Sequence, residues 1–228
     1  LNLAMVLDKS GSMEGAKIEH LREAAKHVVG LLDDEDFVSI TAFSDRVFKI
    51  APSQLASDKS ALTGVIDTIR DGGGTAMSGG MRQGLQELEK HLSEDRVHRM
   101  LLLTDGQTFG DEKECQKLGA KMGDRGIVIQ ALGLGEDWNE DLLDQVAEAS
   151  GGKADFIENP DEISDFFQEA VQQMQGAVVQ DAQLILRLVQ GVVPRQVWRV
   201  TPLIENLGYR PLSDRDVQVD LGEVDKDR

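Results

Sequence analysis

Short apolar runs alternate with amphipathic stretches along the first three quarters of the chain. Apolar runs bounded by polar residues are typical of buried strands, and apolar residues spaced three or four apart are typical of helices. Strands are predicted at 1–7, 37–43, 99–104, 127–134 and 153–157, with an edge strand at 47–50. Helices are predicted at 18–32, 62–69, 81–92, 112–123, 141–149 and 163–174. This alternation predicts an α/β fold with a doubly wound, mainly parallel central sheet flanked by helices.

The pattern changes after Gly176. Strands are predicted at 182–189, 196–201 and 217–221, separated by glycines and prolines, and no helical period appears there. This stretch is too short to form a self-sufficient β-sandwich. We therefore predict one domain over 1–176 and a β-rich segment over 177–228 that is part of a second domain.

The charge of the chain narrows the range of partners. The net charge is −17, and it lies almost wholly in the first domain, because residues 177–228 hold seven Lys/Arg and eight Asp/Glu. An acidic surface repels phosphate backbones, so nucleic acid is a poor partner. No stretch has the apolar length of a membrane helix. The chain opens inside an apolar strand without a methionine, so we expect it to be a piece of a longer protein.

Side chains with hard oxygen atoms gather where strands are predicted to end. Asp8, Ser10 and Ser12 come directly after the first strand, Thr75 follows three glycines, and Asp105 comes directly after Thr104. In sheets of this kind, ligands bind outside the carboxyl ends of the strands. Oxygen ligands suit Mg²⁺, Mn²⁺ or Ca²⁺ rather than zinc. The sequence therefore predicts a divalent-cation site, and this binding chemistry needs no catalytic residue.

The arrangement Asp8-x-Ser10-x-Ser12, followed by Thr75 and then by Asp105, resembles the metal-ion-dependent adhesion site of the von Willebrand factor A family. The resemblance covers residues 1–176 and fills all five ligand positions. The Asp-x-Ser-Gly-Ser-Met form and the β-rich tail further resemble bacterial members named as calcium-activated chloride channel homologues, although nothing in the sequence forms a pore.

The resemblance implies a protein-binding function rather than an enzyme. In such a site the Ser10 and Ser12 hydroxyls bind the ion directly, and the other ligands bind directly or through water. An Asp or Glu carboxylate of a partner protein then completes the coordination shell. We expect the residues next to the ligands to form a shallow rim around the ion: Lys9, Gly11, Met13, Gly74, Ala76, Gln107 and Phe109.

Other interpretations stay open at this point. Each ligand alone could be a helix cap or a turn residue. A strand ending in Asp8 is also found in Mg²⁺-dependent phosphatases that form an aspartyl-phosphate, but those enzymes need a second aspartate where Ser10 stands. The domain could also be a structural module whose metal site is vacant.

Overall fold

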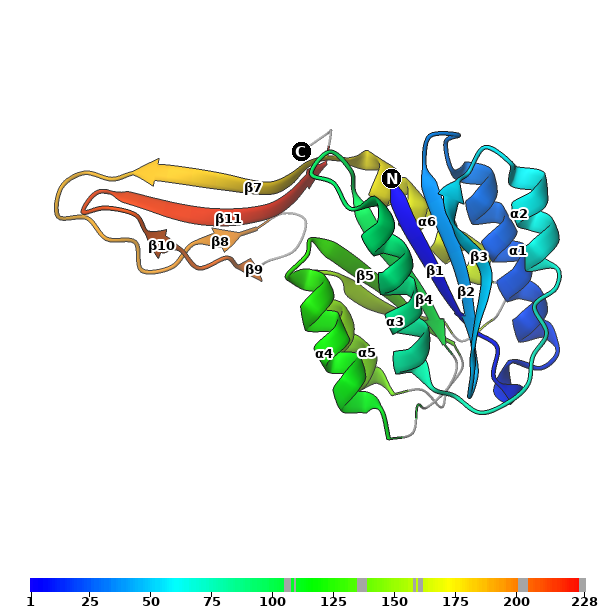
Figure 1. Cartoon of the computed structure of the whole chain (residues 1–228). Coiled ribbons are helices and arrows are strands. Elements are labelled where there is room, and N and C mark those ends of the chain that lie inside the picture. The colour runs from blue at the N-terminus through cyan, green and yellow to red at the C-terminus, as the bar shows by residue number, and fades with distance from the viewer. Residues whose placement is uncertain are drawn as a thin grey trace. The chain divides into compact units, whose positions relative to one another are not determined.

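The chain folds into two compact units, Leu1–Met174 and Gln175–Arg228 (Figure 1). The structure is a computed structural model, and it describes residues 1–104, 108, 110–134, 139–157, 159, 162–200 and 205–225. We call the two units the N-terminal unit and the C-terminal unit.

A six-stranded sheet runs through the N-terminal unit in the order β3-β2-β1-β4-β5-β6. Its strands are β1 (Asn2–Asp8), β2 (Phe37–Phe43), β3 (Val47–Leu55), β4 (His98–Thr104), β5 (Ile127–Leu134) and β6 (Lys153–Ile157). β3 pairs antiparallel with β2, and all the other neighbours pair in parallel. The prediction of a mainly parallel sheet with one antiparallel edge strand is confirmed. β3 continues to Leu55, past the predicted end at residue 50. The prediction stopped short because most side chains of β3 are exposed, so the strand shows no apolar alternation.

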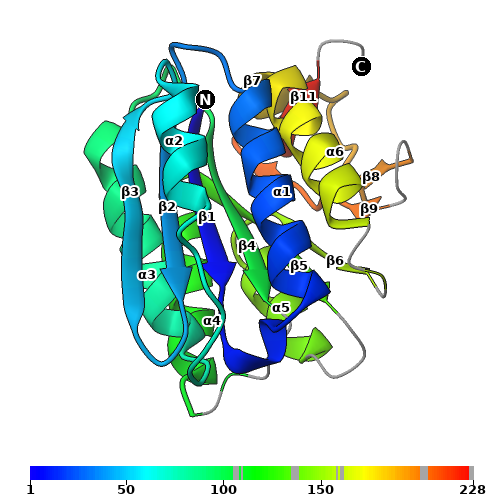
Figure 2. The same cartoon turned by 90° about the vertical axis from the view of Figure 1, so that its right-hand side faces the viewer.

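Helices cover both faces of this sheet (Figure 2). One face carries α1 (Ala16–Leu31), α2 (Lys59–Ile66) and α6 (Ile163–Gly176), and the other carries α3 (Met77–Leu88), α4 (Glu112–Gly123) and α5 (Glu140–Glu148). Alternate residues of β1 enter different cores, Leu3 and Met5 on the first face and Ala4 and Val6 on the second. Burial on both faces explains why residues 3–7 of β1 are an unbroken apolar run.

Two glycines let α3 pack closely against the sheet. A Cβ atom at Gly80 would lie 2.6 Å from Cδ1 of Phe43, and one at Gly84 would lie 2.6 Å from Cγ2 of Val6. The glycines stand four residues apart, so they share the helix face that meets β1 and β2. The start of α3, just after Thr75, is thereby held near the carboxyl ends of these strands.

The C-terminal unit is β structure separate from the central sheet, as expected. β7 (Ala177–Arg187) and β11 (Asp216–Asp225) pair antiparallel, and β10 (Arg210–Pro211) adds to β11. β8 (Trp198–Arg199) and β9 (Glu205–Asn206) form a two-stranded ladder. Among the residues described in both units, no helix is long and apolar enough to cross a membrane.

Glu87 is a buried carboxylate that ties α3 to the edge strand β3. Its side chain is fully buried, and Oε1 lies 2.9 Å from Nζ of Lys49. Oε2 accepts a hydrogen bond of 2.8 Å from the Ser53 amide and pairs with Lys90. Burial alone would raise the pKa of Glu87, but the two lysines and the Ser53 amide outweigh it and lower the pKa to about 2.

We expect Glu87→Gln to flatten the acid limb of the stability curve. A carboxyl whose pKa is lower in the folded state than in the unfolded state stabilises the fold above its unfolded pKa. That contribution is on the order of 3 kcal/mol, and it is lost as the pH falls from about 4.5 toward about 2. Urea unfolding across this pH range measures it.

Glu23→Gln serves as the control, because Glu23 is 69% exposed and its ion pair with Lys26 is a surface pair of little worth. Acid limbs of equal slope in the wild type and in Glu87→Gln would show that the Glu87 cluster does not stabilise the fold.

Candidate functional site

Asp8, Ser10 and Ser12 lie where the chain leaves β1, next to a neighbouring strand, β4, whose chain leaves toward the opposite face of the sheet. β1 and β4 are neighbours in parallel register, with Leu7 opposite Leu103. β1 leads to α1 on one face, whereas β4 leads to α4 on the other. Such a switch point opens a crevice at the carboxyl ends of the strands, where doubly wound folds bind their ligands.

Asp8 is fixed at this point by a hydrogen bond to each of its carboxylate oxygens. Its side chain is fully buried. Oδ1 accepts a hydrogen bond of 2.8 Å from the Ser10 amide, and Oδ2 accepts one of 2.7 Å from Oγ1 of Thr104. A buried charge is tolerated only with such partners. Thr104 is therefore a site residue that the sequence analysis did not identify, because a threonine at a strand end looks like an ordinary β-branched strand residue.

Ser10 and Ser12 present their hydroxyls side by side. Their Oγ atoms lie 3.1 Å apart, with Ser10 buried and Ser12 exposed. The turn that carries them continues into the short 3-10 helix Gly11–Met13. The Met13 side chain is fully buried in the core, so the prediction that it contributes to the rim is wrong. An unbranched apolar side chain next to the first core fills space beneath the turn and anchors it.

The loop that carries Thr75 is fastened to the Ser10–Ser12 turn by its backbone. The Gly72 amide donates to the Lys9 carbonyl at 2.7 Å, and the Gly11 amide donates to the Gly73 carbonyl at 3.0 Å. Gly73 has φ +92°, and a Cβ atom there would lie 2.4 Å from Oδ1 of Asp45. The positive φ and the close approach both require glycine. The glycine run just before Thr75 therefore fits tightly against the turn that carries the serines.

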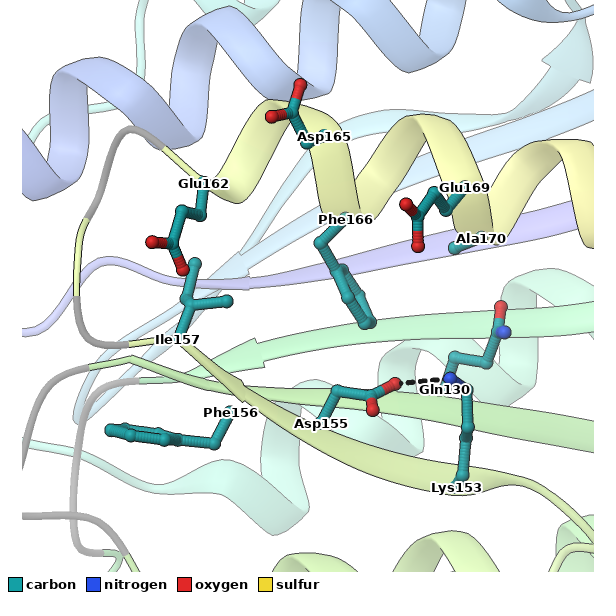
Figure 3. Close-up of a pocket in the computed structure, with 10 residues that line it drawn as sticks. All are labelled: Gln130, Lys153, Asp155, Phe156, Ile157, Glu162, Asp165, Phe166, Glu169 and Ala170. Carbon is teal, nitrogen blue, oxygen red and sulfur yellow. Dashed lines mark ion pairs between the residues drawn. The ribbon is translucent and has the colours of Figure 1, made fainter.

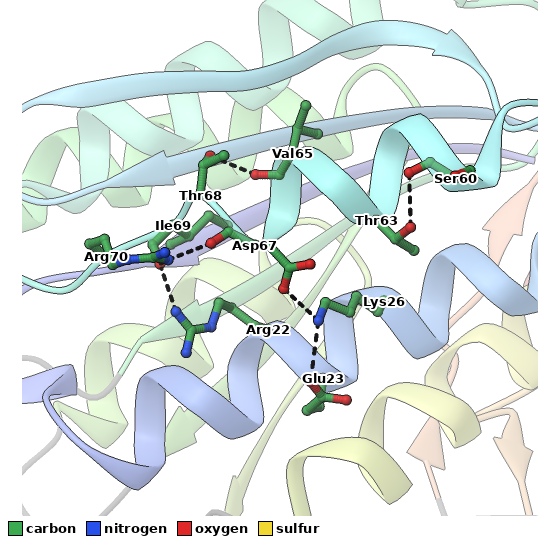
Figure 4. A network of polar contacts seen from close by, with 10 residues as sticks. All are labelled: Arg22, Glu23, Lys26, Ser60, Thr63, Val65, Asp67, Thr68, Ile69 and Arg70. Atoms are coloured by element: carbon green, nitrogen blue, oxygen red, sulfur yellow. Dashed lines mark hydrogen bonds and ion pairs between the residues drawn. The ribbon is translucent and has the colours of Figure 1, made fainter.

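Contacts between α1 and the end of α2 fix the start of the same loop (Figure 4). Arg22 on α1 donates to the Ile69 carbonyl at 3.1 Å, and Lys26 lies 2.6 Å from Asp67. The hydrogen bond from Lys26 lowers the pKa of Asp67, and the same contact raises the pKa of Lys26. Arg70 donates to the carbonyls of Asp67 and Ile69. These contacts hold the chain in place just before the glycine run.

Asp105 lies outside the described residues, but two described residues that follow it, Thr108 and Asp111, contact α3. Oγ1 of Thr108 donates to Asp111 and accepts a hydrogen bond of 3.3 Å from the Met77 amide. Oδ2 of Asp111 accepts one of 2.8 Å from the Ser78 amide. Two residues that follow β4 thus hold the first turn of α3, which begins just after Thr75. Gln107 and Phe109, predicted for the rim, also lie outside the described residues.

The β2–β3 hairpin forms a wall of the site that the sequence analysis missed. The Lys9 amide donates to the Phe43 carbonyl at 2.8 Å, and the Ala76 amide donates to the Ser44 carbonyl at 2.9 Å. Beyond the turn, Phe48 is 39% exposed, and Nζ of Lys9 lies 4.8 Å from the centre of its ring. The hairpin therefore places an apolar ring against the cation of Lys9, next to the ligand loops. It carries no ligand motif, and its place beside the site follows only from how β2 pairs with β1.

The donor groups gathered here are carboxylate and hydroxyl oxygens. The part of the chain that the structure describes contains no cluster of three His, Cys, Asp or Glu residues able to hold a metal ion. A site at Asp8, Ser10 and Ser12 therefore depends on hydroxyl oxygens, which suit hard cations better than zinc.

Comparison with known proteins identifies relatives over most of the chain. Residues 2–170 match the family model of the von Willebrand factor type A domain. An uncharacterized protein of Synechocystis is 36% identical over 189 residues, which cover 82% of this chain and 45% of that protein. Human inter-alpha-trypsin inhibitor heavy chain H4 is 30% identical over 78% of this chain and 21% of its own length. The chain thus spans less than half the length of these relatives.

Solved structures share the fold. A von Willebrand factor type A protein from Catenulispora acidiphila superposes with a TM-score of 0.79 at 23% identity, covering 98% of this chain and 55% of that one. Proximal thread matrix protein 1 from the mussel byssus, described with a zinc-occupied MIDAS motif, gives a TM-score of 0.63 at 17% identity over 82% of this chain and 49% of its own. The resemblance to chloride channel homologues stays a prediction that these matches do not test.

Thr104→Val should destabilise the fold by about 1–3 kcal/mol, because it removes a donor from a buried carboxylate and keeps the shape of the side chain. Thr41→Val on β2 is the matched control. Oγ1 of Thr41 is buried without a hydrogen-bond partner, so its loss should be neutral or stabilising. Urea unfolding of both variants measures the difference. Equal effects would mean that the Thr104 hydroxyl does not hold Asp8.

Proposed function

The chain belongs to the von Willebrand factor type A family, and we propose that its N-terminal unit is a metal-dependent module for binding a protein partner. In this proposal Asp8, Ser10, Ser12, Thr75 and Asp105 hold one divalent cation, as a metal-ion-dependent adhesion site. The bound ion supplies a Lewis-acidic centre that accepts an Asp or Glu carboxylate of the partner.

The distance between the two serine hydroxyls carries this proposal. Neighbouring ligands around an octahedral Mg²⁺, each about 2.1 Å from the ion, are about 3.0 Å apart. The Oγ atoms of Ser10 and Ser12 are 3.1 Å apart. This hydrogen-bonded pair stands at the spacing of one edge of a Mg²⁺ coordination shell, which supports these two serines as neighbouring ligands.

The hydrogen bonds of Asp8 indicate its part in the site. The Ser10 amide and the Thr104 hydroxyl each engage one of its oxygens, so the carboxylate is oriented before any ion binds. A carboxylate has about four acceptor positions in all, so these hydrogen bonds are compatible with further ones from waters on the ion. Asp8 therefore supplies negative charge and orientation, while the two hydroxyls supply direct and neutral ligands.

Neutral ligands matter for the choice of partner. A site built mostly from hydroxyls leaves the ion with much of its positive charge, and a bound ion is often the largest local charge in a site. An acidic side chain of a partner is then attracted despite the net charge of −17. Among the described rim residues, Gly11 and Gly74 are exposed, and Lys9 and Ala76 are half-buried, so a protein surface can approach. Phe48 and Lys9 extend this surface along the hairpin.

We expect Mg²⁺ to raise the free energy of unfolding in a concentration-dependent way, by about 2.7 kcal/mol at a hundred times its dissociation constant. Ser12→Ala should remove most of this response, because it takes away a direct ligand. Ser12 is exposed, so the variant should still fold. Thermal unfolding with Mg²⁺, Mn²⁺, Ca²⁺ and Zn²⁺ measures the response and ranks the ions.

Ser60→Ala, an exposed serine at the start of α2, is the control and should keep the full response. A response of the same size in Ser12→Ala and in Ser60→Ala would refute the assignment of the site.

Partner binding should require the ion and should be strengthened by the hairpin. Capture of a partner on the immobilised chain should occur in Mg²⁺ and stop in EDTA or with Ser12→Ala. Phe48→Ala should weaken capture by on the order of 1 kcal/mol, because an exposed ring near the centre of an interface adds binding energy. It should leave the Mg²⁺ response unchanged.

Leu55→Ala is the matched control, because Leu55 is an exposed apolar residue at the other end of β3, 45% accessible. A partner that binds equally well in EDTA would show that the interaction does not use the ion.

A further inference from the structure

A second cavity lies between the edge of the central sheet and α6, built from elements that the metal site does not use (Figure 3). Its volume is about 320 Å³, near the lower end of the range for small-ligand sites. Its floor is formed by Gln130 of β5 and by Lys153 and Asp155 of β6, and α6 contributes Phe166 and Glu169.

A buried amide without a partner points into this cavity. The Gln130 side chain is only 8% exposed, and its Oε1 atom has no hydrogen-bond partner. Figure 3 shows the amide extending from the sheet toward α6, beside Ala170. A buried polar group that lacks a partner destabilises a protein, so its presence calls for a ligand or another explanation.

The walls of the cavity carry mostly negative charge. Asp155, Glu162, Asp165 and Glu169 contribute four carboxylates. Lys153 is the one basic residue among the lining residues, and its Nζ pairs with Asp155 at 2.7 Å. Both side chains are partly exposed, so this ion pair is weak. Another cation can therefore replace Lys153 beside Asp155 or bind next to it. The field inside the cavity therefore favours a positively charged ligand.

The remaining walls favour an organic cation over a metal ion. Figure 3 shows the Phe166 ring extending from α6 toward the sheet, between Glu169 and Asp155. An aromatic face packs well against an alkyl stem and attracts a cationic head group. No group of three metal-ligating His, Cys, Asp or Glu side chains occurs among the described residues. An ammonium or guanidinium group also donates hydrogen bonds, which the amide oxygen of Gln130 can accept.

We propose that this cavity binds an alkyl cation, a guanidinium or ammonium group on a short apolar stem. Asp155 and Glu169 hold the charged head, Gln130 accepts a hydrogen bond from it, and Phe166 packs against the stem. A free amine and the side chain of an arginine or lysine in a peptide offer the same chemistry. The cavity is the binding site in either case, and the two sources are separated by experiment.

Calorimetric titration with agmatine, and with a short peptide that holds a single arginine between alanines, tests the proposal. We expect saturable binding of at least one probe, equally in Mg²⁺ and in EDTA, so the outcome does not depend on the metal site. Asp155→Asn and Glu169→Gln should each weaken binding about tenfold, the equivalent of one charged hydrogen bond. Lys153→Met should strengthen binding, because it removes the competing cation.

Gln130→Leu gives a readout that a purely structural residue would not give. It should raise the melting temperature of the free protein, because a buried unpaired amide is removed, and it should weaken binding of the probe. Glu148→Gln, an exposed carboxylate at the end of α5 outside the cavity, should leave binding unchanged.

Tighter binding of the peptide would assign the site to a protein side chain, and binding of agmatine alone would assign it to a free amine. No saturable binding of either probe at millimolar concentration would overturn the proposal. Equal weakening of binding by Glu148→Gln and by Asp155→Asn would also overturn the proposal. Such a result would mean that the probe responds to the net charge of the protein and not to the cavity.

Discussion

One buried carboxylate organises the end of the sheet at which we propose the cation site. Asp8 is fully buried at the end of the central strand, and a charge in that position is stable only if its oxygens are hydrogen-bonded. Two of its donors come from different places along the chain: the Ser10 amide belongs to the loop after β1, and the Thr104 hydroxyl ends β4. The hydrogen bonds to Asp8 therefore link the ends of β1 and β4, and they fix the turn that presents the serine hydroxyls. The glycine loop then packs against that turn through backbone hydrogen bonds.

The fold, and the gathering of Asp8, Ser10 and Ser12 at one strand end, could be predicted because they follow from periodicity and from where strands stop. β1 reads as an apolar run that stops at Asp8, and parallel strands bring their carboxyl ends to one edge of the sheet. The structure places Asp8, Ser10 and Ser12 together there, with the loop of Thr75 fastened beside them. The boundaries of elements with little apolar periodicity were harder to predict. β3 is mostly exposed, so its length is set by pairing with β2 and not by its own apolar residues.

Residues that act through tertiary contact left little trace in the sequence. Thr104 differs from any strand threonine only in what lies opposite it, and the hairpin wall depends on how β2 and β3 meet the ligand loops. Met13 follows the ligand motif, yet its side chain turns inward because the short 3-10 helix directs it to the core. Gln130 is visible in the sequence as a polar residue inside the otherwise apolar run of β5. A polar side chain in such a strand indicates a candidate binding position.

The hairpin wall is attached to the ligand loops through main-chain atoms. The Phe43 carbonyl receives the Lys9 amide, and the Ser44 carbonyl receives the Ala76 amide. Neither contact depends on which side chains stand at the exposed tip of the hairpin. Substitutions at the tip are therefore expected to leave the proposed cation site intact. Under that proposal, related chains that differ only at the hairpin tip would recognise different proteins while keeping the same cation chemistry.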